Sequence, residues 1–173
     1  MLQEMTTQVF DLGLTESLTE RRGAAIETIL AGDMVCVLPP GHGLARQRIV
    51  TPMDFTGQPF IYFGQNDPYR HKLDDVFSSA GVACNYAAET TTAASVCAMV
   101  ALGMGISVIN PLTAASHMGR DVVFRRLSVS VPYVLSVWRP AHSTRAAQAK
   151  KFVAALHSAA TNMSTRLAKV LDA

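Results

Sequence analysis

The chain has 173 residues, 49% hydrophobic and 16% charged, which is enough apolar material for one ordinary domain or two small lobes. An unstructured chain is therefore not expected. The 15 basic and 13 acidic side chains leave a net charge of +2, which argues against a nucleic-acid-binding surface. Three cysteines, Cys36, Cys84 and Cys97, show no C-x-x-C pair and no zinc spacing. Their odd number fits reduced, mostly buried thiols in a cytoplasmic protein better than a secreted disulfide framework.

The first third of the chain predicts three strands, at residues 9–14, 34–38 and 60–63. Pro39 and Pro40 end the second strand, because proline cannot continue a sheet ladder. The runs do not alternate between apolar and polar residues. This favours strands that are covered on both faces, as in a parallel sheet.

A helix is predicted after the third strand. Asp67 suits the N-cap and Pro68 the first helical position. Gly81 can end the helix. Four apolar side chains share one helical face: Leu73, Val76, Phe77 and Ala80.

The middle of the chain continues with a strand at residues 84–88, a helix that begins near Ala93 and a strand at residues 106–109. The expected buried face of this helix consists of Ala93, Val96, Cys97, Val100 and Ala101. Alternation of strand and helix is typical of a doubly wound α/β lobe. The apolar stretch 93–109 also approaches the length of a membrane span, but two glycines divide it and no basic residue flanks it closely. We therefore expect no membrane segment.

The last third predicts strands at residues 122–124 and 134–138, which Asn110 and Pro111 separate from the preceding strand. A final helix is expected from Ser143 or Thr144, with a polar tail from Thr161 whose last turns are expected to fray. The apolar stripe of this helix consists of Ala149, Phe152, Val153, Leu156 and Ala160.

No motif of the sequence predicts catalysis, a metal or a cofactor. Gly103 and Gly105 follow a helix, whereas a dinucleotide fingerprint follows a strand and opens a helix. We expect these glycines to close the helix and to allow tight packing on the following strand. The five histidines lack ligand spacing, and no G-x-S-x-G elbow is present. A catalytic triad could still be assembled from residues far apart in the sequence, but no local motif indicates one.

Three polar clusters follow predicted strands, where an open α/β sheet places its ligand crevice. Hydroxyls and backbone N–H groups at helix starts suit a carboxylate, while an acidic side chain can pair with an ammonium group. Together they describe a site for a small zwitterion such as an amino acid. In the alternative interpretation, Asp67 and the threonines only cap helices, Arg70 is a solvated charge and Tyr69 packs in the interior. The candidate residues are Thr15, Glu16 and Ser17, then Gln65, Asp67, Tyr69 and Arg70, then Thr90, Thr91 and Thr92.

Residues 10–16, 35–42 and 98–111 resemble, in order and spacing, the effector-binding domain of LysR-type transcriptional regulators. The resemblance extends to about Ala160. It implies a periplasmic-binding-protein-like (type 2) α/β fold with two Rossmann-like lobes and two crossover strands. Lobe I would comprise residues 1–52 and 131–173, and lobe II residues 53–130. The match begins in mid-lobe, so the first strand and helix of lobe I are absent from it, which implies an incomplete site and an exposed sheet edge.

The resemblance also implies a site and a function. Thr15 matches an effector-contacting hydroxyl of lobe I, and residues 90–92 match an effector-facing helix start of lobe II. Residues 95–100 and 110–114 look most like the diaminopimelate-responsive activators of lysine synthesis, although opine-responsive relatives share much of this stretch. The implied role is effector sensing without catalysis, in a homo-dimer or tetramer. DNA would be bound only by a winged helix-turn-helix that nothing here resembles.

Two alternatives remain at this point. The chain could sense another basic amino acid or an opine. It could also be a solute-binding protein of the same fold, but such a protein normally carries a signal peptide, and residues 1–7 lack that pattern.

Overall fold

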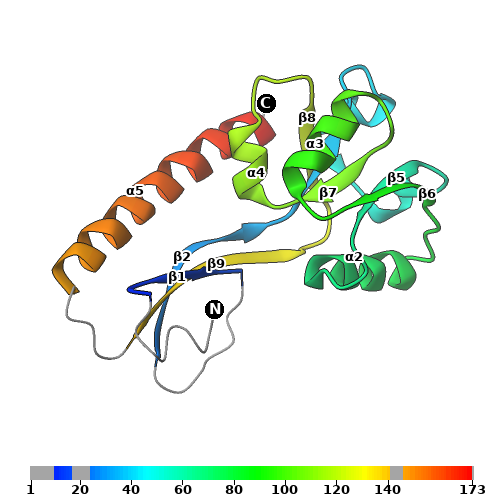
Figure 1. Ribbon diagram of the computed structural model, residues 1–173. Helices are drawn as coiled ribbons and strands as arrows, with labels where there is room; N and C mark the ends of the chain where they lie inside the picture. Colours follow the sequence, from blue (N-terminus) through cyan, green and yellow to red (C-terminus); the bar gives the residue numbers. More distant parts are fainter. Residues whose placement is uncertain (1–9, 17–23, 141–145, 173) are drawn as a thin grey trace. The chain divides into compact units, whose positions relative to one another are not determined.

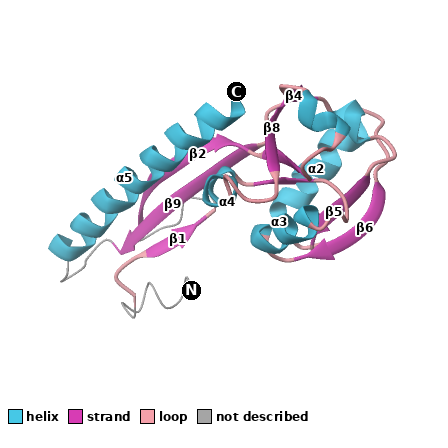
Figure 2. Ribbon diagram, turned by 90° about the horizontal axis from the view of Figure 1, so that it is seen from above, coloured by secondary structure: helices cyan, strands magenta, loops and turns pink. Residues whose placement is uncertain are grey.

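A computed structural model describes residues 10–16, 24–140 and 146–172 (Figures 1 and 2). Ser17 and the predicted start of the last helix lie outside these residues. The chain divides into two compact units: unit 1 falls within residues 1–32 and 132–163, and unit 2 within residues 33–131 and 164–173. Unit 2 thus includes residues 33–52, which the resemblance would give to lobe I. The predicted lobe boundaries stay a prediction.

Unit 1 contains a three-stranded sheet with the order β1 (Gly13–Thr15), β9 (Pro132–Pro140), β2 (Ala24–Asp33). β1 is antiparallel to β9 and is shorter than the predicted strand 9–14. β9 confirms and extends the strand predicted at 134–138. β2 was not predicted, because Glu27 and Thr28 interrupt its apolar pattern. Glu27 is held inside the unit by an ion pair with Arg139 and by His157 Nε2 at 2.9 Å.

The long helix α5 (Ala146–Leu171) runs beside the strands of unit 1 (Figure 2). Of its predicted stripe, Ala149, Val153 and Ala160 are buried, Leu156 is half-buried, and Phe152 is 52% exposed. The stripe prediction was therefore wrong for Phe152.

The C-terminal turns of α5 belong to unit 2. The predicted fraying of the last turns was wrong, because the helix continues to Leu171 and both Leu167 and Leu171 are buried. The following residue, Asp172, accepts hydrogen bonds of 2.8 Å from Arg48 and from Arg126. Buried apolar side chains and paired charges thus keep the last turns helical.

Unit 2 is built on a sheet in two parts. Four strands have the order β4 (Ile49–Val50), β8 (Val123–Leu127), β3 (Val35–Leu38), β7 (Ser107–Ile109). β5 (Pro59–Phe63) pairs in parallel with β6 (Asn85–Thr90), and a parallel bridge between Phe60 and Ile106 links β5 to β7.

The strands predicted at 34–38, 60–63, 84–88, 106–109 and 122–124 therefore exist, with small shifts of their ends. β3, however, is antiparallel to both β7 and β8. The expectation of a parallel strand was wrong here, because a strand buried on both faces has the same apolar run in either direction.

The helices of unit 2 are α2 (Pro68–Ser79), α3 (Ala93–Ala101) and α4 (Pro111–Ser116), with short 3-10 turns η1 (Gly43–Arg46) and η2 (Pro52–Phe55). The N-cap Asp67 and the helix end at Gly81, where φ is 66°, were predicted correctly. On the predicted faces Val76 and Ala80 are half-buried and Ala101 is exposed, while the other residues are buried.

The interior of unit 2 packs around Phe55, Phe60 and Phe77, whose ring centroids lie 5.2–5.8 Å apart. Gly103 has φ 74° and closes α3. Gly105 lies against β5, since a Cβ there would be 2.5 Å from the carbonyl oxygen of Pro59. Gly103 therefore closes α3 as expected, but the close approach is that of Gly105 to β5 and not that of α3 to the strand that follows it.

All three cysteines are free and lie in unit 2. Cys36 and Cys97 are buried, and burial raises the pKa of both thiols, that of Cys97 to about 11. Cys84 is half-buried. In the described part of the chain, no helix has the length and apolar character that a membrane span requires.

Candidate functional site

Three strand ends of unit 2 are each followed by a helix. β5, β6 and β7 run in the same direction, because β5 is parallel to β6 and its bridge to Ile106 is also parallel. α2, α3 and α4 begin within a few residues of these strand ends. The polar groups at the three helix starts therefore lie along the same edge of the sheet, where α/β proteins place ligands.

At the start of α2, Asp67 is an N-cap. Its Oδ1 accepts hydrogen bonds from the backbone N–H groups of Tyr69 at 2.8 Å and Arg70 at 3.4 Å. Among the described residues, both of these hydrogen bonds go to Oδ1 and none goes to Oδ2. Gln65 is exposed, whereas Tyr69 is buried with Lys72 Nζ 4.8 Å from its ring centroid.

At the start of α3, Thr92 is an N-cap: its Oγ1 accepts a 3.1 Å hydrogen bond from the backbone N–H of Ser95. Thr91 and Thr92 are exposed and Thr90 is half-buried. The carbonyl oxygen of Thr90 accepts a 3.1 Å hydrogen bond from the backbone N–H of Gly64, and a Cβ at Gly64 would lie 3.9 Å from Thr91 Cγ2. The loop before α2 and the loop before α3 are thus direct neighbours.

Arg70 is not a solvated surface charge. Its Nη1 donates to the carbonyl oxygen of Phe63 and to Glu89 Oε2, both at 2.9 Å, and its Nε lies 3.4 Å from Asp74 Oδ2. The guanidinium carbon is 4.4 Å from the centroid of the Tyr62 ring. Two carboxylates therefore already match the charge of this side chain. Burial, reinforced by Cys84, raises the pKa of the Tyr62 phenol to about 12, so it stays protonated.

The unit 1 candidates are held in and beside β1. Thr15 is the last residue of β1, is half-buried and lies opposite Ser136 of β9. Glu16 Oε1 accepts a 3.0 Å hydrogen bond from the hydroxyl of Tyr133. Because these residues belong to unit 1 and the other candidates to unit 2, a shared site stays a prediction.

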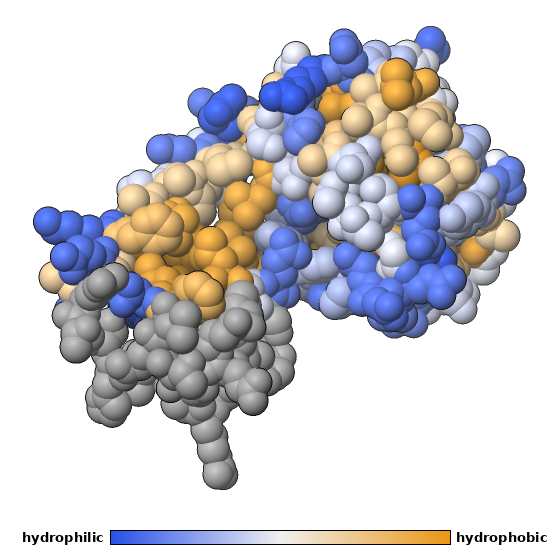
Figure 3. Space-filling view, in the orientation of Figure 1, coloured by the Kyte–Doolittle hydropathy of each residue, from blue (hydrophilic) through white to orange (hydrophobic). Residues whose placement is uncertain are grey.

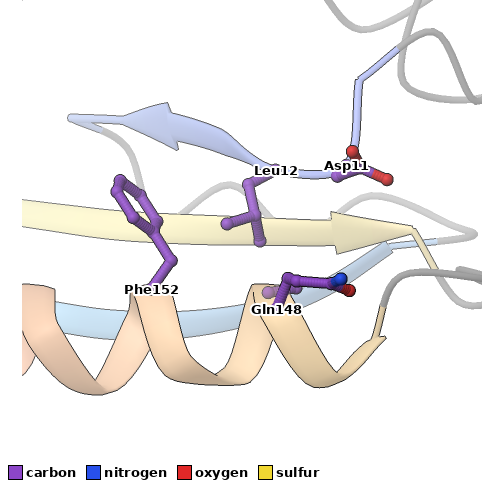
Figure 4. A pocket seen from close by; sticks show the side chains of 5 residues that line it. Asp11, Leu12, Gln148 and Phe152 are labelled. Carbon is purple, nitrogen blue, oxygen red and sulfur yellow. The ribbon is translucent and has the colours of Figure 1, made fainter.

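A pocket of unit 1 contains none of the predicted residues. It has a volume of about 540 Å³ and lies between the residues that precede β1 and the first turns of α5 (Figure 4). Leu12 points toward α5 between Phe152 and Gln148. Apolar side chains gather over this part of unit 1 in Figure 3. The lining is Asp11, Leu12, Gln148, Ala149 and Phe152.

Asn110 is a candidate that the sequence interpretation missed. It caps α4 at the end of β7, where its Oδ1 accepts a 2.8 Å hydrogen bond from the backbone N–H of Thr113. The pair Asn110-Pro111 repeats the cap-and-proline pattern of Asp67-Pro68, which was the signal available in the sequence. In the described residues, no group of three or more His, Cys, Asp or Glu side chains could hold a metal ion.

Comparison with known proteins decides the family. The family model described as the LysR substrate binding domain matches residues 1–161. The chain belongs to the LysR family. It is 42% identical to the transcriptional activator protein LysR of Escherichia coli K12 over 99% of the chain and 56% of that protein. It is 30% identical to the regulatory protein NocR of Agrobacterium tumefaciens T37 over 90% of the chain and 52% of that protein. The chain thus spans about half the length of these curated relatives.

Solved structures give the same fold. The regulatory domain of Synechocystis CcmR, solved in complex with 2-PG, matches with a TM-score of 0.73 at 19% identity. The match covers 94% of this chain and 79% of that one. The expected periplasmic-binding-protein type 2 fold is therefore confirmed. The chain is the effector-binding domain of a LysR-family transcription regulator, which is a non-enzymatic class of protein.

Proposed function

We propose that this domain senses diaminopimelate and controls the expression of lysine-biosynthesis genes as part of a cytoplasmic activator. The 42% identity to E. coli LysR over nearly the whole chain carries this proposal. The effector would bind in a cleft between the lobes, with Thr15, Glu16 and Ser17 on one side. The other side would consist of Gln65, Asp67, Tyr69, Thr90, Thr91 and Thr92, with Arg70 behind the loops that carry them.

The chemistry of the two adjacent loops of unit 2 supports an amino-acid effector. Diaminopimelate has two ends, each with an ammonium and a carboxylate group. The start of α3 offers the hydroxyls of Thr91 and Thr92 and the positive end of the helix dipole to a carboxylate. The carboxylate of Asp67, in the neighbouring loop, suits the ammonium group.

Signalling requires a difference in affinity between two arrangements of the protein. An effector that binds both arrangements equally shifts no population, however tightly it binds. Coupling free energies of about 1 to 3 kcal/mol are typical of such systems. We propose that diaminopimelate favours one degree of lobe closure or one subunit packing in a homo-dimer or tetramer. DNA would be contacted only by a winged helix-turn-helix outside this domain.

Calorimetric titration with meso-diaminopimelate tests the proposal. We expect binding by the intact effector domain that contains this chain and its loss in Thr15→Ala and in Thr92→Ala. Thr161→Ala, the same change at an exposed position of α5, is the matched control and should bind normally. Unchanged affinity in both site variants would show that the site lies elsewhere.

A second candidate is an opine or another basic amino acid, because opine-responsive relatives share much of the stretch 95–114 that resembles the diaminopimelate-responsive activators. A thermal-shift panel with diaminopimelate, lysine, arginine and an opine separates the two candidates. The true effector raises the unfolding midpoint in proportion to the logarithm of its concentration relative to its Kd. A shift with the opine alone would replace diaminopimelate as the effector.

A further inference from the structure

The guanidinium of Arg70 forms hydrogen bonds to residues at the C-terminal ends of two parallel strands, β5 and β6. Its Nη1 donates to the carbonyl oxygen of Phe63, the last residue of β5, and to Glu89 of β6, each at 2.9 Å. The loop 64–67 begins directly after Phe63, and Thr90 follows Glu89. One nitrogen atom therefore fixes both strands at the points where the chain enters the two candidate loops.

The surroundings of Arg70 make it a poor partner for an effector carboxylate. Its charge is matched by Glu89 and, at 3.4 Å, by Asp74, and its side chain is only 17% exposed. A third carboxylate would be repelled by these two, since like charges at such distances are unfavourable. The stacking of the guanidinium on the ring of Tyr62 further fixes its plane.

We propose that Arg70 is a positioning residue of the effector site, which sets the separation of loops 64–67 and 90–92 without contacting the effector. The inference rests on the proposed function. It requires the planar guanidinium, because a lysine ammonium can pair with Glu89 but cannot hold the Phe63 carbonyl and stack on Tyr62 with the same geometry.

Two variants test the positioning role through their affinity for meso-diaminopimelate, and the sign of the change in Glu89→Gln separates positioning from direct contact. Arg70→Lys should weaken calorimetric binding about tenfold. Glu89→Gln should also weaken binding, because it replaces the ion pair between Arg70 and Glu89 with a weaker, uncharged hydrogen bond and so positions Arg70 less firmly. If Arg70 instead bound an effector carboxylate, Glu89→Gln would remove a competing negative charge and tighten binding. Arg126→Lys is the matched control, since Arg126 forms a 2.8 Å ion pair in the same unit with Asp172; its affinity should stay unchanged.

Amide hydrogen exchange provides a readout without ligand. The backbone N–H of Gly64 bonds to the carbonyl oxygen of Thr90 and so reports directly on the contact between the loops. It should exchange about tenfold faster in Arg70→Lys than in the unaltered chain, and at the unaltered rate in Arg126→Lys.

Each outcome decides the proposal. Weaker binding in both Arg70→Lys and Glu89→Gln together with faster exchange of Gly64 supports it. Unchanged affinity in Arg70→Lys, unchanged or tighter binding in Glu89→Gln, or an unchanged Gly64 exchange rate in Arg70→Lys overturns it while the proposed function stands. Absence of diaminopimelate binding by the intact effector domain without substitutions overturns the proposed function and this inference together.

Discussion

The substitution Gly105→Ala should separate β7 from β5 and strongly destabilise unit 2. A Cβ at this position would lie 2.5 Å from the carbonyl oxygen and 3.0 Å from the carbonyl carbon of Pro59. Both are backbone atoms, so no side-chain rotation relieves the clash. For the oxygen contact to lengthen from 2.5 Å to an ordinary 3.4 Å, the strands must separate by about 0.9 Å.

That separation affects two backbone hydrogen bonds. The N–H of Ile106 donates to Pro59 O at 2.8 Å, and the N–H of Ile61 donates to Ile106 O at 2.9 Å. With about 1 kcal/mol for each bond and a further 1 kcal/mol or so for overpacking, Gly105→Ala should cost about 3 kcal/mol. For a chain of this size the unfolding midpoint should fall by about 6 to 12 °C.

Urea unfolding followed by circular dichroism measures the loss, and Gly103→Ala is the control. Gly103 has φ 74° and nothing within 4 Å of its added Cβ, so that variant has only the backbone cost of about 1 kcal/mol. If Gly105→Ala were no more destabilising than Gly103→Ala, the packing argument would be refuted.

Three further predictions concern the caps, the last helix and Tyr62. Asp67→Ala should lower the free energy of unfolding by about 1 kcal/mol through loss of the α2 cap, and Asp67→Asn, which can accept the same bonds, should restore it; equal losses in urea unfolding would contradict this. Leu167→Ala should cost about 2 to 5 kcal/mol in urea unfolding, whereas Val170→Ala, at a 37% exposed position, should cost little; equal losses would show that the end of α5 is not packed. Because the folded-state pKa of Tyr62 is raised to about 12, its contribution to stability is complete below pH 10 and is lost as the pH rises toward 12. Ultraviolet titration should show a tyrosine ionisation near pH 12 that is lost in Tyr62→Phe; a titration that Tyr62→Phe leaves unaltered would disprove the assignment.

The sequence could predict those helices and strands whose ends and buried faces are marked by neighbouring residues, such as caps, prolines, glycines and apolar stripes. α2 is an example, because Asp67, Pro68 and Gly81 mark its ends and an apolar stripe marks its face. β2 was missed because Glu27 stabilises it through contacts with Arg139 and His157, which are more than 100 residues away in sequence. A pairing of that kind leaves no periodic pattern in the strand itself.

The same distinction applies to the candidate site. The positions of Thr90, Thr91 and Thr92 at a helix start could be read from their place between a strand and an apolar helix. The role of Arg70 could not, because it depends on Glu89, which is 19 residues away, and on a backbone carbonyl of the neighbouring strand. The sequence shows that Arg70 carries a positive charge. Only the parallel pairing of β5 with β6 shows which groups surround that charge.

The distribution of cysteines makes the chain its own conformational reporter. Cys36 in β3, Cys84 before β6 and Cys97 in α3 all belong to unit 2, and two of them are sealed from solvent. An alkylating reagent will therefore modify Cys84 first and reach the other two only when that half of the molecule opens. Mass spectrometry of pulse-labelled protein would therefore measure the rate at which unit 2 opens. Unit 1 contains no cysteine and would contribute no signal.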